Sequence, residues 1–136
     1  MRRVFADTHF LIALLNERDA DHGRAHEWWG DLHADEISTT AWVLVELADG
    51  MSRPHSRTIC AGFIQDLRTG RSIRVFEPEA ALLWRGFDLY RQRGDKEWSL
   101  TDCISFVVMA DEGLTEALTG DRHFEQAGFT ALLAAG

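Results

Sequence analysis

The sequence predicts an α/β fold: a single domain, residues 1–136, whose central five-stranded and mainly parallel sheet has the strand order 3-2-1-4-5 and helices on both faces. The chain has 136 residues, of which 46% are apolar, enough for one core but not for two. Short β-prone runs alternate with longer runs whose apolar residues recur at helical spacing. This alternation is typical of a parallel sheet between helices, and the order is the usual one for a doubly wound sheet.

The first half of the chain contains two of the expected strands and four helices. The strands are the β-prone runs at residues 3–6 and 36–39. The helices are expected at residues 8–16, 19–33, 40–50 and 56–69. Asp19 or Asp21 is a suitable cap for the second helix and Thr40 for the third, while Gly70 ends the fourth.

The second half contains three more strands, expected at residues 72–76, 116–120 and 129–133. Pro78 suits the first turn of a helix that ends near Gly94. Residues 99–113 follow with a helical run that is apolar almost all round, which indicates a buried central helix. Residues 121–128 are expected to form a loop or a helical turn.

Composition limits the location and the partners of the protein. Its formal net charge of −8 argues against simple nucleic-acid binding, which needs clustered Lys and Arg, unless bound cations reverse the local field. No run is long enough to span a membrane, and Asp7 interrupts any signal-peptide core. We therefore expect a cytoplasmic protein without membrane contact. Cys60 and Cys103 lie in apolar runs and are expected to be buried thiols.

Four acidic residues stand out, three where expected elements begin or end and Glu46 inside the helix AWVLVELA, and each has an ordinary structural explanation. Asp7 is placed to cap the helix that follows it, and Glu46 to face solvent. Asp102 completes the capping-box pattern Ser99-x-x-Asp102. Asp121 suits a turn.

Taken together, the four acids predict a cation site. Asp7 follows the first strand and Asp121 the fourth, and these strands are neighbours where the strand order reverses, the usual ligand site of such sheets. Carboxylates held close together repel, so they must take up protons or bind cations. Oxygen donors of this kind suit Mg²⁺ or Mn²⁺ rather than zinc.

Four segments also resemble a known family. They are VFADTHFLIALL, TTAWVLVELADG, SLTDCISFVVMADEG and EALTGDRHFEQAGF. In this order they are similar to the signature segments of PIN-domain ribonucleases, and the short form resembles the toxins of VapBC-type toxin–antitoxin modules. The likeness runs from Met1 to about Leu133.

The resemblance implies an Mg²⁺- or Mn²⁺-dependent endoribonuclease that acts on RNA, forms a homodimer and is silenced by a cognate antitoxin protein. It assigns Asp7, Glu46 and Asp102 as the core metal-binding and catalytic carboxylates and Asp121 as the fourth acid. Thr8 and Thr119 match polar positions that support the site. Some relatives carry a further acid where this chain has His123, which is then a phosphate contact, a weak metal ligand or a loop residue.

Two other functions remain open at this stage. A phospho-aspartyl signalling or phosphotransfer domain also uses a doubly wound sheet with an Asp after a strand. Such a site needs a second nearby acid or a late lysine, whereas His9 stands two residues after Asp7 and no lysine follows Lys96. A catalytically inactive PIN fold that serves only as a binding module is the other alternative.

Overall fold

A five-stranded sheet with the order β3-β2-β1-β4-β5 forms the centre of the computed structural model, which describes residues 2–70 and 73–134. All four strand pairings are parallel, so the predicted order is confirmed. The strands are β1 (Val4–Ala6), β2 (Ile37–Thr40), β3 (Arg74–Phe76), β4 (Glu116–Leu118) and β5 (Thr130–Ala131).

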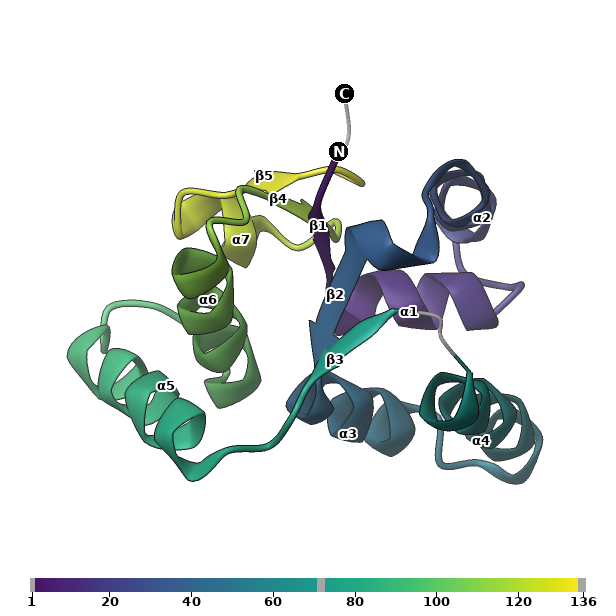
Figure 1. Cartoon of the computed structure of the whole chain (residues 1–136), viewed down its shortest axis with the longest axis horizontal. Helices are drawn as coiled ribbons and strands as arrows, with labels where there is room; N and C mark the ends of the chain where they lie inside the picture. Colours follow the sequence, from purple (N-terminus) through teal and green to yellow (C-terminus); the bar gives the residue numbers. More distant parts are fainter. Residues whose placement is uncertain (1, 71–72, 135–136) are drawn as a thin grey trace.

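Helices cover both faces of this sheet (Figure 1). They are α1 (Thr8–Leu15), α2 (His22–Asp31), the 3₁₀ turn η1 (Ala34–Glu36), α3 (Ala41–Gly50), α4 (Pro54–Thr69), α5 (Ala80–Gln92), α6 (Leu100–Glu112) and α7 (Arg122–Gln126). In Figure 1, α1, α2 and α4 lie on one side of the sheet and α5, α6 and α7 on the other, while α3 lies beyond the end of β2. Within the described ranges, no helix combines the length and the apolar character that a membrane crossing requires.

The core surrounds β1 and α6. All three residues of β1 are fully buried, as expected for a central parallel strand that is covered on both faces. Most of α6 is buried as well, which confirms the prediction of a central helix. The thiols of Cys60 and Cys103 are free and buried, as predicted. The first turn of α6 and the end of β1 are therefore held rigidly, and both carry acidic residues of interest.

Several predicted boundaries are wrong. The second helix begins at His22 instead of Asp19, because the Asp19 carboxylate accepts a hydrogen bond from the Asp21 N–H and forms a separate turn. Pro78 precedes α5 instead of occupying its first turn, since the Glu79 N–H bonds to the Glu77 carbonyl in a tight turn.

The predicted start of α4 and the lengths of three strands also differ from the structure. Pro54 occupies the first turn of α4, where its missing N–H costs nothing. The strand predicted over 72–76 begins at Arg74, and residue 72 lies outside the described residues. β4 ends at Leu118, two residues earlier than predicted, and β5 covers only Thr130–Ala131.

Helix α5 packs closely against α6 at a glycine. Gly86 is buried, and a Cβ at this position would overlap Cγ1 of Ile104 and lie 3.1 Å from the backbone N and Cα of that residue. Backbone atoms two residues after Asp102 therefore pack directly on α5. The close approach fixes the helix that carries Asp102.

We predict that Gly86→Ala destabilises the protein by about 1–3 kcal/mol, because the added methyl overfills the α5–α6 contact. Gly62→Ala is the matched control. It lies in the exposed part of α4 with no atom within 4 Å of an added Cβ, so it should stabilise the helix by up to about 1 kcal/mol. Urea unfolding measures both changes, and a Gly86→Ala protein as stable as wild type would contradict the packing argument.

Candidate metal centre

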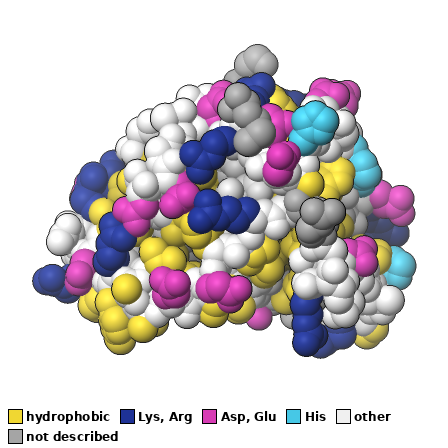
Figure 2. Space-filling model, in the orientation of Figure 1, with side chains coloured by type: hydrophobic (Ala, Val, Ile, Leu, Met, Phe, Trp, Pro, Cys, Tyr) yellow, Lys and Arg dark blue, Asp and Glu magenta, His cyan; other side chains and the backbone are white. Residues whose placement is uncertain are grey.

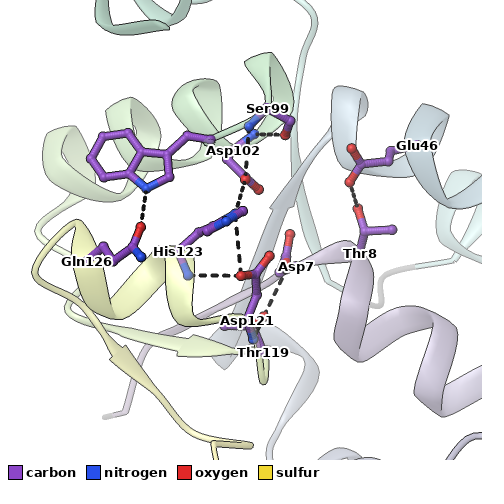
Figure 3. A network of polar contacts seen from close by, with 10 residues as sticks. Asp7, Thr8, Glu46, Ser99, Asp102, Thr119, Asp121, His123 and Gln126 are labelled. Atoms are coloured by element: carbon purple, nitrogen blue, oxygen red, sulfur yellow. Dashed lines mark hydrogen bonds and ion pairs between the residues drawn. The ribbon is translucent and has the colours of Figure 1, made fainter. Parts of the chain in front are cut away.

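Four structural elements bring the predicted acids to the carboxyl edge of the sheet (Figure 3). Asp7 directly follows β1, and its backbone N–H donates to the Leu118 carbonyl at the end of β4 (3.2 Å). Asp121 precedes α7 after the turn that leaves β4. Asp102 lies in the first turn of α6, and Glu46 lies on α3. The neighbouring β1 and β4 thus place Asp7 and Asp121 on one edge, as the strand order predicts.

The Asp7 carboxylate is buried with one oxygen unpaired. The residue is 3% exposed. Its Oδ2 accepts a hydrogen bond from the Thr119 hydroxyl (3.0 Å), whereas its Oδ1 has no hydrogen-bond partner among the described residues. Asp7 occupies the N-cap position of α1, but its side chain makes no capping bond there, so capping alone does not explain this buried acid. A buried oxygen left without a partner is costly, and it indicates a ligand.

The surroundings of Asp7 oppose its negative charge. Burial, followed by the nearby charge of Asp102, raises the pKa of Asp7 to about 7. Burial also raises the pKa of Asp102, against the opposing effects of the Ser99 N–H and His123. A bound cation would remove this penalty for both carboxylates.

Two threonine hydroxyls orient the acids. Thr119 is fully buried, and its Oγ1 donates to Asp7 while accepting the backbone N–H of Asp121 (3.0 Å). It therefore links two of the predicted acids. The Thr8 hydroxyl donates to Oε1 of Glu46 (2.6 Å) and directs this carboxylate toward the same edge (Figure 3). Glu46 lies close enough to contribute to the raised pKa of Asp7. Solvent exposure, predicted for Glu46 from its place on the helix, therefore does not fully describe this side chain.

Asp102, Asp121 and His123 form the tightest cluster at this edge. Oδ2 of Asp102 accepts the Ser99 N–H (3.2 Å), and the predicted capping box is complete. The same oxygen lies 3.1 Å from Nδ1 of His123, which is 3.4 Å from Oδ1 of Asp121. One donor atom from each residue lies within 4.8 Å of the others, close enough for a shared ion.

A contact that the sequence pattern does not reveal holds the turn before Asp121. The Gly120 N–H donates to Nδ1 of His9 (3.0 Å), and Nε2 of His9 lies 3.4 Å from Oδ2 of Asp21. A Cβ on Gly120 would lie 2.8 Å from Cε1 of His9, so this position requires glycine. The glycine before Asp121 was visible in the sequence, but its partner lies 111 residues away.

Several arginines form ion pairs with acids away from this edge. Arg2 pairs with Glu116 (2.9 Å), while Arg3 and Arg74 both pair with Glu112 (3.5 and 2.9 Å). These pairs lie at the amino ends of β1, β3 and β4 and the last residue of α6. Within residues 2–70 and 73–134, no Lys or Arg forms an ion pair with any of the four predicted acids. Their negative charge is left for a cation from solution.

The donor set fits a divalent cation. The unpaired oxygen of Asp7, the neighbouring carboxylates and the absence of a competing Lys or Arg pair in the described ranges all favour one. Oxygen-rich sites of this kind suit hard divalent ions. The structure brings Asp102 and Asp121 within reach of one ion and links Asp7 to Asp121 through Thr119, whereas Glu46 bonds to Thr8 and acts on Asp7 through its charge.

This sheet and its acidic edge define a PIN domain. The model of the PIN domain family matches residues 4–130, and the chain belongs to this family. The predicted family resemblance is confirmed.

Among characterised proteins, the chain is similar to the 23S rRNA-specific endonuclease VapC20 of two Mycobacterium tuberculosis strains. The identity is 29% over 131 residues, which cover 93% of this chain and 95% of VapC20. The crystal structure of VapC20, described as a sarcin-ricin loop cleaving toxin, superposes with a TM-score of 0.86 at 28% identity and covers 95% of this chain and 98% of VapC20. FitAcB from Neisseria gonorrhoeae has a TM-score of 0.61 at 19% identity, with 94% of each chain covered. The latter likeness concerns the fold alone.

We predict that Asp7→Asn changes how stability depends on pH in the metal-free protein. The folded-state pKa of about 7 lies above the unfolded value of about 3.9. The stability contributed by Asp7 is therefore full below about pH 4 and is lost as the pH rises through about 7. In EDTA, the wild-type Tm should fall several degrees further between pH 5 and 8 than the Tm of Asp7→Asn.

Asp88→Asn, at an exposed position of α5, is the control for this measurement and should retain the wild-type pH profile. Thermal unfolding followed by circular dichroism is sufficient. Parallel Tm curves for wild type and Asp7→Asn would show that the Asp7 carboxyl does not titrate abnormally in the folded protein.

Proposed function

We propose that this chain is an Mg²⁺- or Mn²⁺-dependent endoribonuclease and the toxin of a type II toxin–antitoxin module. The observation that carries the proposal is the unpaired, buried oxygen of Asp7 next to other acids that no Lys or Arg in the described ranges neutralises. The similarity to VapC20 over nearly the full length of both chains supports an RNA substrate. Because VapC20 acts on 23S rRNA, ribosomal RNA is the first substrate class to test, and we expect the protein to act in the cytoplasm.

Each site residue has a role in this proposal. Asp7, Glu46, Asp102 and Asp121 hold the ion, while Thr119 and Thr8 keep the carboxylates of Asp7 and Glu46 in place. When bound, the ion lowers the pKa of a water and neutralises charge on the phosphate. A water activated in this way needs no side-chain nucleophile beside it. We therefore assign water as the attacking group, with 5′-phosphate and 3′-hydroxyl ends as products.

The acidic net charge agrees with this role. A polyanionic RNA is repelled by the four carboxylates until cations reverse the local field. The cation thus supports both substrate binding and catalysis.

We predict that Asp7→Asn and Asp102→Asn each lower RNA cleavage at least about 100-fold, because losing a carboxylate weakens metal binding and charge stabilisation worth several kcal/mol. Asp88→Asn should retain wild-type activity. Cleavage of ribosomal RNA in Mg²⁺, Mn²⁺ and EDTA, with sequencing of the new ends, gives activity, ion requirement and product chemistry together.

Either of two results would contradict this assignment. One is wild-type cleavage by Asp7→Asn and Asp102→Asn. The other is tight antitoxin binding by a wild-type protein that cuts no RNA with any divalent ion, which would instead identify a binding module.

A homodimer is also proposed, on the basis of an exposed aromatic row on α5. Trp84, Phe87 and Tyr90 are 60%, 38% and 49% exposed, and their rings contact one another in sequence. Figure 2 shows hydrophobic side chains gathered at the lower left, where Figure 1 places α5. Large exposed apolar patches mark protein interfaces. The antitoxin requires a further surface, for which exposed Val45 and Ile59 are candidates.

We predict that Trp84→Glu converts a dimer to a monomer, because the charge would have to be buried in the interface. Sedimentation velocity at several protein concentrations measures the change. Glu79→Gln, before the start of α5 and away from the aromatic row, is the control. A wild-type protein that stays monomeric would overturn the dimer without affecting the nuclease assignment.

A further inference from the structure

His123 lies among the acids at the carboxyl edge instead of facing solvent. Its side chain is 20% exposed, and its Nδ1 points between the carboxylates of Asp102 and Asp121 (Figure 3). The distances are 3.1 Å to Oδ2 of Asp102 and 3.4 Å to Oδ1 of Asp121. An imidazole nitrogen thus occupies a position that an ion bound by both carboxylates would reach.

The backbone holds His123 in this place. Its N–H donates to Oδ1 of Asp121 (2.9 Å), which caps α7. The next residue, Phe124, is fully buried and packs against Phe5 and Phe106. Gln126 accepts a hydrogen bond from the Trp98 indole N–H (3.0 Å), which joins α7 to the segment before α6. Little movement is therefore needed for His123 to bind an ion.

A second observation indicates that a ligand belongs here. The unpaired Oδ1 of Asp7 is buried at the same edge and points toward the carboxylates of Asp121 and Asp102 (Figure 3). The charge of Asp102 acts on Asp7 strongly enough to raise its pKa. The unsatisfied buried oxygen of Asp7 therefore lies at the same edge as a donor set that includes nitrogen.

The nitrogen changes which ion the site favours. Mg²⁺ is a hard ion that takes oxygen ligands in near-ideal octahedral geometry. First-row transition ions also accept imidazole, and Mn²⁺ among them is compatible with carboxylates as well. Replacing an acid with a histidine thus costs more Mg²⁺ affinity than Mn²⁺ affinity.

We propose that Asp102, Asp121 and His123 form a mixed nitrogen–oxygen subsite that binds a transition ion such as Mn²⁺ in preference to Mg²⁺, with His123 as a direct ligand. This inference rests on the proposed function and specifies the ligands and the ion preference of its metal centre. The subsite can be measured without RNA, so its failure is distinguishable from failure of the nuclease assignment.

The test uses metal-free full-length protein, Mn²⁺ and Mg²⁺ titrations by calorimetry, and pulsed EPR of the Mn²⁺ complex. We expect His123→Ala to weaken Mn²⁺ binding about tenfold or more and Mg²⁺ binding less than about threefold. His123→Asp, which supplies an all-oxygen donor set, should narrow the difference between the two ions. His55→Ala, at an exposed position of α4, should change neither affinity.

The EPR measurement decides whether contact is direct. Wild type and His55→Ala should show ¹⁴N hyperfine coupling to Mn²⁺, and His123→Ala should lose it. The proposal is overturned by a wild-type spectrum without nitrogen coupling, by coupling that persists in His123→Ala, or by equal losses of Mn²⁺ and Mg²⁺ affinity. If His123→Ala does not fold, His123→Gln and the wild-type spectrum answer the question. Nitrogen coupling in a protein that cuts no RNA would support the subsite and count against the nuclease function.

Discussion

The burial of a carboxylate beside other acids at the end of β1 is the constraint on which the rest of the structure depends. Asp7 follows a fully buried strand, and burial together with Asp102 disfavours its charge. A protein keeps such a group only where the surroundings hold it and a ligand compensates it. The hydroxyls of Thr119 and Thr8, the capping box at Ser99 and the His9 contact to Gly120 all restrain acids or the turns that carry them.

The helices that carry the site are held in place by packing contacts of residues outside the site. Gly86 lets α5 approach the backbone of α6 near Asp102, and Phe124 anchors α7 in the core next to His123. These contacts stabilise the fold, whereas the burial of the Asp7 and Asp102 carboxylates opposes it. Sites that destabilise their own fold are common where function needs preorganised charge. In this protein, helices α6 and α7 carry both kinds of residue: buried contacts that stabilise the fold, and acids at the edge of the sheet.

Much of the fold and of the acidic edge followed from local pattern. Alternation of strands and helices implied a parallel sheet, and its usual order placed Asp7 and Asp121 on one edge. Predictions from local pattern were wrong where a contact with a distant residue or a competing local turn determined the structure. Asp7 resembled a helix cap, but its bond goes to Thr119, 112 residues away. Asp19 resembled a helix start but closes a turn, and Pro78 precedes its helix because of a tight turn at Glu79. The position of His123 between two carboxylates depends on how α7 packs, which one sequence does not reveal.

The arginine pairs at the amino ends of the strands have a consequence for encounter with RNA. Arg2, Arg3 and Arg74 neutralise glutamates at the amino ends of the strands, whereas no Lys or Arg in the described ranges pairs with the four acids at the carboxyl end. Negative charge at the carboxyl end is therefore less neutralised, and in the proposed function this end would repel a polyanion before an ion binds. If the proposed function holds, a bound ion would reverse this repulsion. Free divalent-ion concentration would then control the association rate as well as the chemical step, and the metal-free protein would be slow to encounter RNA.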